Sequence, residues 1–151
     1  MNARTADALG ERPRTRWHLS LVGKVRLAAE IVIAYARVRY LLRRHAEFPT
    51  ALAAVRRRSA APRPHEGRTE LEAGVGLGNA VVRTLGLLPT DSRCLMRSLV
   101  LTAVLERRGI ASRFVIGVRG AGDDFLAHAW VEYDGLPLLP AGDDFERLTE
   151  L

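Results

Sequence analysis

The chain has 151 residues, of which 48% are hydrophobic, with a net charge of +6 and one cysteine. This size and composition fit one globular domain with a single core. One cysteine excludes an intramolecular disulfide and a zinc site built from several cysteines, and residues 1–16 have no apolar run of signal-peptide length, so a reducing cytoplasm is expected.

Charge is distributed unevenly along the chain. Residues 1–58 contain thirteen Arg or Lys and four acids, whereas residues 121–151 contain one Arg and eight acids. A basic amino-terminal half suits nucleic acid, an anionic membrane surface or an acidic protein partner. No nucleic-acid-binding motif accompanies the charge, so nucleic acid is not expected as a partner. A solvated, arginine-rich face is the simpler alternative.

Residues 1–18 are expected to be disordered, because they are rich in Arg, Ala and Pro and poor in large hydrophobic side chains. Residues 19–60 are expected to form an amino-terminal helical portion. Its main element is a long helix over residues 20–45, with apolar residues on two neighbouring faces. This helix is too charged to span a bilayer. Contact with an anionic membrane surface is an alternative, but packing on the core or on a partner protein is favoured.

The next expected element is a short helix over residues 50–58, which follows Pro49. Residues 59–64, with two prolines, break the helical pattern. They are the best candidate for a hinge between the helical portion and residues 67–151.

A third helix is expected to start at the capping pattern of Thr69 and Glu72 and to run to about residue 86. Gly74, Gly76 and Gly78 lie inside it, and each costs about 1 kcal/mol relative to alanine. Either this helix is locally thin for close packing or it starts later.

A fourth helix is expected over residues 92–108, followed by strands over 113–118 and 125–133. The dipeptide Asp134-Gly135 is typical of a two-residue hairpin, which leads to a third strand over 136–139. The sequence therefore predicts an α+β fold in which a helix packs on a small antiparallel sheet of three strands.

Cys94 falls in the first turn of the fourth helix, with Thr90, Asp91 or Ser92 as the amino-terminal cap. Free backbone N–H groups and the helix dipole there favour the thiolate, which is the nucleophilic form. The same N–H groups are suited to hold a developing oxyanion. For a single cysteine in an apolar helix, a buried core residue is the alternative.

His128 lies in the second predicted strand, where alternation places it on one face with Leu126, Trp130 and Glu132. A helix packed across the sheet brings the cysteine and this histidine together as a thiolate and imidazole pair. The alternative is a half-buried histidine held by hydrogen bonds.

A third group is needed to orient the imidazole. The hairpin register pairs residue 129 with residue 140, which puts Pro140 and Ala141 beside His128, and neither is expected to orient the ring. The nearest acid on the continuing chain is Asp143, which we prefer as the third member. Asp144 and Glu132 remain open as alternatives.

Several short motifs resemble the lasso peptide biosynthesis B2 protein, a transglutaminase-like cysteine peptidase that removes the leader from a lasso precursor peptide. The resemblance covers residues 70–151 and implies a papain-like core with no metal or cofactor. The residues that carry it are CLMRSL at 94–99, LERRGI at 105–110, VIGVR at 115–119 and AHAWVEYDG at 127–135.

The resemblance implies that Cys94 attacks the peptide carbonyl and that His128 acts as base and then as acid. Family members carry an acid near position 140, where this chain has Pro140. That departure leaves the third member open and motivates the alternative of a non-catalytic scaffold with the same fold. Another acyl-transfer enzyme, such as a transglutaminase or an amine acyltransferase, is the third hypothesis.

The implied partners are the precursor peptide, a separate leader-recognition B1 protein, and a downstream ATP-dependent cyclase that receives the freed core peptide. The helix over residues 20–45 is the expected docking surface for the B1 protein.

Overall fold

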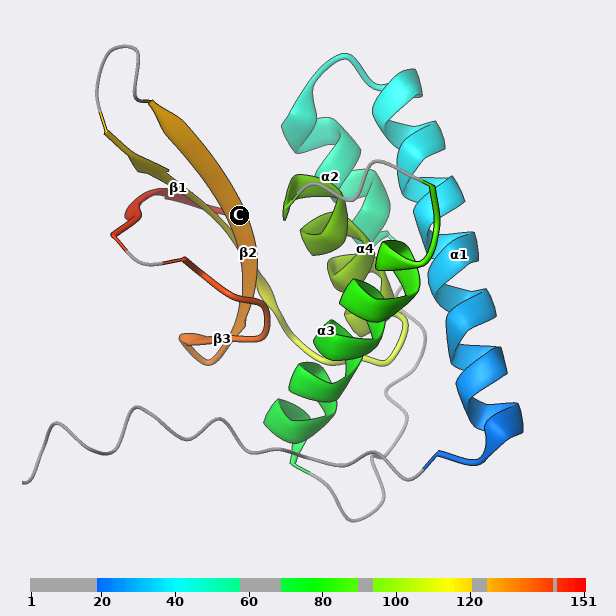
Figure 1. The fold of residues 1–151 in the computed structure, drawn as a ribbon. Helices are drawn as coiled ribbons and strands as arrows, with labels where there is room; N and C mark the ends of the chain where they lie inside the picture. The colour runs from blue at the N-terminus through cyan, green and yellow to red at the C-terminus, as the bar shows by residue number, and fades with distance from the viewer. Residues whose placement is uncertain (1–18, 58–68, 90–93, 121–124, 143) are drawn as a thin grey trace, which may run out of the picture.

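A computed structural model of the chain describes residues 19–57, 69–89, 94–120, 125–142 and 144–151. The fold is α+β, as predicted, with helices on one side and an antiparallel sheet on the other (Figure 1). The segment expected to be disordered and the expected hinge lie outside the described residues. The elements are α1 (Leu21–Arg44), α2 (Phe48–Arg56), α3 (Glu70–Gly86), α4 (Cys94–Glu106), β1 (Arg113–Arg119), β2 (Leu126–Tyr133), β3 (Leu136–Pro137) and β4 (Glu146–Glu150).

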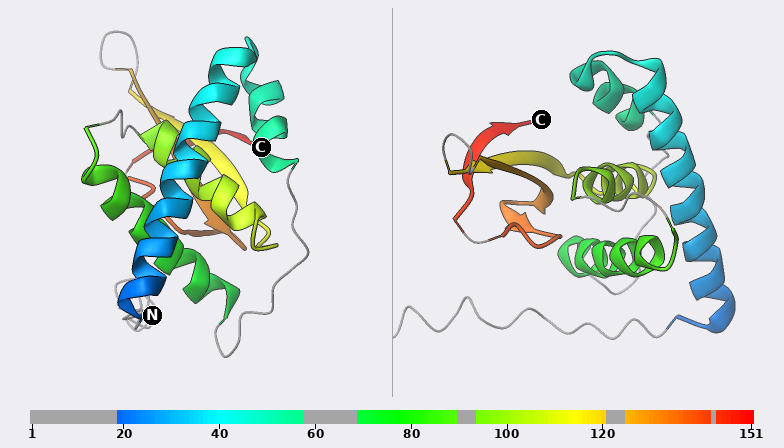
Figure 2. Two further views of the ribbon diagram at one scale, coloured as in Figure 1. Left: turned by 90° about the vertical axis from the view of Figure 1, so that its right-hand side faces the viewer. Right: turned by 45° about the horizontal axis from the view of Figure 1, so that its top comes forward.

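The elements are stacked in layers. Figure 2 shows α3 and α4 between the sheet on one side and α1 on the other. Helix α4 is buried along most of its length, from Ser98 to Leu105. Its position in the middle layer explains why its sequence is apolar on nearly every face, since only a helix covered on several sides can be so.

Helix α1 begins at Leu21, one residue after the predicted start, and Ser20 caps it, since its Oγ accepts a hydrogen bond from the Gly23 N–H at 3.2 Å. Its inner face is fixed to the end of α4 by a paired contact in which Arg108, in the turn just after α4, donates to both carboxylate oxygens of Glu30 at 2.7 Å each. A bidentate pair of this kind sets the rotation of α1 as well as its distance from α4. Among the described helices, none is long and apolar enough to cross a membrane.

Helix α2 starts two residues earlier than predicted, at Phe48, with Pro49 in its first turn. The ring of Phe48 packs against that of Phe114 on β1, with centroids 5.7 Å apart. One buried cluster contains residues from α1 and α2 as well as from the helices and strands after residue 69. The amino-terminal helices therefore share a core with the rest of the chain.

Helix α3 begins at the predicted cap, where the Thr69 Oγ1 accepts from the Glu72 N–H at 3.3 Å. The glycines within it allow close packing, which settles the two alternatives left by the sequence. A Cβ at Gly78 would lie 2.5 Å from the carbonyl oxygen of Leu138, and one at Gly74 would lie 2.9 Å from the Leu138 side chain. The segment that follows β3 therefore lies directly on the backbone of α3.

The sheet has four strands in the order β3-β2-β1-β4, not three as predicted. The additional strand, β4, pairs antiparallel with the outer side of β1. The predicted hairpin is confirmed, since Asp134 and Gly135 have φ of 48° and 76° between β2 and β3. The register of β2 with β3 is also the predicted one, with Tyr133 opposite Leu136.

Gly78→Ala is expected to lower the free energy of unfolding by about 1–3 kcal/mol, because the new methyl group meets a backbone oxygen that cannot rotate away. Gly86→Ala, at the end of the same helix, is the matched control, since nothing lies within 4 Å of its Cβ position. Urea unfolding of the two variants measures the difference. Equal stabilities would contradict the close approach of α3 to Leu138.

Candidate active site

Cys94 is the first described residue of α4 and is half-buried. One turn further on, the buried Ser98 donates its hydroxyl to the carbonyl oxygen of Ala129 on β2 at 2.9 Å. Four residues advance a helix by about 6 Å, and they return to nearly the same face. The start of α4 therefore packs against β2 at Ala129, the residue that follows His128 in the strand, and Figures 1 and 2 both show the two elements side by side. The predicted cap residues, 90–92, lie outside the described residues.

His128 is half-buried on β2, between two aromatic rings. Its ring centroid lies 5.9 Å from that of Trp130 and 5.2 Å from that of Phe145. Trp130 in turn covers Gly117 on β1, where a Cβ would lie 2.7 Å from the indole. The absent side chain at position 117 lets the indole lie close against β1, and the contacts of the imidazole with Trp130 and Phe145 restrict its rotation.

The imidazole also has a polar partner, the main-chain carbonyl of Pro140, whose oxygen lies 2.8 Å from Nε2. A carbonyl oxygen can only accept, so Nε2 must carry the proton in this contact. In the neutral ring, Nδ1 then keeps its lone pair. The predicted hairpin register correctly places Pro140 beside His128. The prediction that Pro140 does not contact the ring as an orienting group was wrong, because the contact is made by its main-chain carbonyl and not by its side chain.

The three acids proposed from the sequence differ in their exposure and in their contacts. Asp143 lies outside the described residues, and Asp144 is exposed with a φ of 65°. Glu132 is 2% exposed, and its Oε1 accepts from Trp130 Nε1 and from Arg147, both at 2.7 Å. Glu132 therefore holds the indole and β4 in place, and neither of these hydrogen bonds is to the imidazole.

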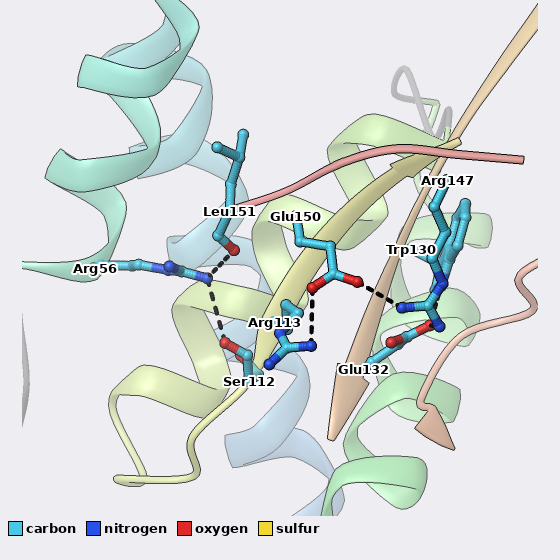
Figure 3. A network of polar contacts seen from close by, with 8 residues as sticks. All are labelled: Arg56, Ser112, Arg113, Trp130, Glu132, Arg147, Glu150 and Leu151. Carbon is cyan, nitrogen blue, oxygen red and sulfur yellow. Dashed lines mark hydrogen bonds and ion pairs between the residues drawn. The ribbon is translucent and has the colours of Figure 1, made fainter. Parts of the chain in front are cut away.

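A network of charged side chains joins β4 to β1 and β2, as Figure 3 shows. Arg147 bridges Glu132 and Glu150, and Glu150 also pairs with Arg113 of β1 at 2.8 Å. The pKa of Arg147 is raised above its usual value, first by its hydrogen bond to Glu150 and then by the charge of Glu132. These contacts hold Phe145, just before β4, over the imidazole.

A second contact in Figure 3 fixes the end of β4. The guanidinium of Arg56 on α2 donates to the carbonyl oxygens of Leu151 and Ser112, at 2.8 and 3.3 Å. The two carbonyls belong to neighbouring strand ends, because Leu151 and Phe114 exchange both backbone hydrogen bonds. Helix α2 therefore holds the end of β4 against the start of β1.

The structure brings the Cys94-bearing helix end and the His128-bearing strand together, although no hydrogen bond joins the two side chains among the described residues. A thiol at a helix start and an imidazole whose Nδ1 makes no hydrogen bond within the described part of the chain are the parts of a nucleophile and base pair, and such contacts often tighten only when substrate binds. Within the described residues there is no cluster of three or more His, Cys, Asp or Glu that would hold a metal ion.

Comparison with known families agrees with this arrangement. The family model of the transglutaminase-like superfamily matches residues 31–151, which run from the middle of α1 through β4. The chain belongs to the transglutaminase-like superfamily. This superfamily includes cysteine peptidases and acyltransferases, so membership supports cysteine-dependent chemistry without choosing between the two. Searches of curated proteins and of solved structures found no match.

Membership in the transglutaminase-like superfamily also bears on the amino-terminal helices. The matched region includes the second half of α1 and all of α2, together with the strands that carry the candidate site. The helical portion that the sequence separates from residues 67–151 thus falls partly within the family domain. The position of a boundary between the two portions stays a prediction.

Proposed function

We propose that this protein is a cysteine peptidase that removes the leader from a lasso precursor peptide. The observation that supports the proposal is the hydrogen bond from Ser98 to Ala129, which ties α4 one turn after Cys94 to the residue that follows His128, in a chain of the transglutaminase-like superfamily. The motifs around Cys94 and His128 that resemble the lasso B2 family supply the substrate class. A reaction of this kind needs no metal or cofactor.

The proposed reaction uses two steps and one covalent intermediate. His128 takes the thiol proton at Nδ1, and the sulfur of Cys94 attacks the carbonyl carbon after the last leader residue. Backbone N–H groups at the start of α4 stabilise the oxyanion. The imidazolium then gives its proton to the leaving amine, which is the new amino terminus of the core peptide. Water, deprotonated by His128, hydrolyses the thioester and releases the leader with a free carboxyl group.

Two other functions follow from the same fold. An acyltransferase forms the same thioester but passes the acyl group to an amine instead of water. A scaffold protein uses the fold for binding only, as the absence of an acid at position 140 suggests. The peptidase is favoured over the scaffold because the imidazole has an orienting acceptor, the Pro140 carbonyl, despite the missing acid.

Cys94→Ala is expected to lower the rate of leader removal at least about a thousandfold, because the covalent step is lost. Mass spectrometry of the precursor peptide, incubated with and without an added primary amine, is the measurement. A shortened peptide in both samples supports the peptidase, and a new amide in the second supports an acyltransferase. Unchanged processing by a variant with wild-type thermal stability would contradict any enzyme function for Cys94.

The outer face of α1 supports the proposed leader-recognition partner. Apolar side chains stand exposed along it at helical spacing, including Val25 and Ile33 at 62% and Tyr40 at 59% exposure. Exposed basic residues flank this stripe, namely Arg26, Arg39, Arg43 and Arg44. The acid of α1, Glu30, is turned inward to Arg108. A second copy of this surface would oppose like charges, so the stripe favours a partner with an apolar and acidic helix face.

In a coupled assay, adding the leader-recognition protein is expected to accelerate cleavage of the full precursor. Ile33→Asp is expected to remove that acceleration, because it places a charge in the apolar stripe. Leu148→Asp is the matched control, since Leu148 is 65% exposed on β4, away from α1. Retained acceleration in Ile33→Asp, or equal loss in both variants, would show that α1 is not the docking surface.

A further inference from the structure

The contact between His128 and Pro140 differs in kind from the acid that the resemblance implies at position 140. The acceptor at 2.8 Å from Nε2 is a main-chain carbonyl, and the side chain of Pro140 has no polar atom. Substituting this residue therefore leaves the acceptor in place. The position of the acceptor depends on the path of the backbone, and neighbouring residues fix that path both before and after Pro140.

On one side, α3 fixes the backbone just before Pro140. Leu138 donates its N–H to the Val131 carbonyl at 2.8 Å, and its own carbonyl fits against Gly78. On the other side, Gly142 turns the chain with a φ of 76°, a conformation suited to glycine. A Cβ at Gly142 would lie 2.9 Å from the Phe145 ring and 3.7 Å from the His128 ring. The carbonyl of Pro140 is thus aimed by a short, tightly packed segment.

We infer that the main-chain carbonyl of Pro140 orients the imidazole of His128 in place of a carboxylate, so that the third member of this active site is a backbone group. This inference rests on the proposed cysteine chemistry. The carbonyl holds the ring with the proton on Nε2 and leaves the Nδ1 lone pair to take the thiol proton. Pro140 is a positioning residue, because it acts on the substrate only through His128.

A neutral acceptor differs from a carboxylate in how strongly it stabilises the imidazolium. A carbonyl dipole stabilises the imidazolium less than a full negative charge would. The thiolate and imidazolium pair should then persist over a narrower pH range, with the basic limb of the pH–rate profile at lower pH than a carboxylate would give.

Other charged groups lie on the elements around the ring. Arg119 lies over the Phe145 ring at 5.1 Å, and Glu132 is paired with Arg147 at 2.7 Å. Among the described residues, the titratable and charged groups on the elements around the ring are Cys94, Arg97 and Glu106 on α4, Arg113 and Arg119 on β1, Glu132 and Tyr133 on β2, Asp144 before β4, and Glu146, Arg147 and Glu150 on β4.

The first test reads the proton position directly and does not depend on turnover. Ring ¹⁵N chemical shifts of His128, assigned by comparison with His128→Gln, are measured at a pH where the ring is neutral. The proton is expected on Nε2, with Nδ1 unprotonated. A ring protonated on Nδ1 would overturn the inference, even if the peptidase reaction itself is confirmed. An inactive wild-type protein would instead count against the proposed function.

The second test weakens the carbonyl alone. Lactic acid in place of Ala141, introduced by suppression of an amber codon, turns the Pro140 carbonyl into an ester carbonyl, which is a weaker acceptor. The Ala141 N–H that is lost makes no hydrogen bond among the described residues. Alanine inserted by the same route is the matched control. The ester is expected to lower kcat roughly three- to tenfold with little change in KM, and to move the basic limb to lower pH.

An ester variant with the kcat and pH profile of the alanine control would overturn the inference. Asp143→Asn tests the acid preferred from the sequence in the same assay. A loss of kcat smaller than that of the ester is expected, because the Nε2 position is already occupied. A loss as large as that of Cys94→Ala would transfer the orienting role to Asp143 and would also overturn the inference.

Discussion

The buried hydrogen bond between Ser98 and the Ala129 carbonyl is the contact on which the proposed active site depends. It joins the layer of helices to the sheet at the level of His128, and it lies one helical turn from Cys94. Both groups are buried, so losing either partner would leave the other without water to replace it. The proposed nucleophile and base come from one helix end and one strand that pack together, so the proposed pair depends on no long loop.

A second constraint acts from the opposite side of the imidazole. The glycines of α3 allow the chain after β3 to lie on the helix backbone, and this path brings the Pro140 carbonyl to His128. The glycines look unfavourable for a helix when α3 is considered alone, since each lowers its intrinsic stability. Their value is in the packing, because a side chain at Gly78 would displace the segment that orients the ring. Helix α3 therefore acts on the site without contributing a side chain to it.

Local signals explain which parts of this fold were predictable. Ser20 and Thr69 cap their helices through contacts three residues away, and Asp134-Gly135 has the positive φ that its hairpin requires. Strand β4 was missed because its pairing with β1 is distant in sequence and its burial pattern shows no alternation between a buried and an exposed face. The orienting group was missed for a different reason: sequence motifs report side chains, whereas the acceptor at Pro140 is a backbone atom placed by packing.

The reactivity of Cys94 tests most directly whether the thiol and the imidazole act as a pair. Since the chain has one cysteine, alkylation by iodoacetamide reports on that thiol alone. His128→Ala is expected to lower the alkylation rate at neutral pH about tenfold or more, because the thiolate loses its imidazolium partner. His45→Ala, at the end of α1, should keep the wild-type rate. Equal rates in the wild-type protein and His128→Ala would contradict the pair and the peptidase function built on it.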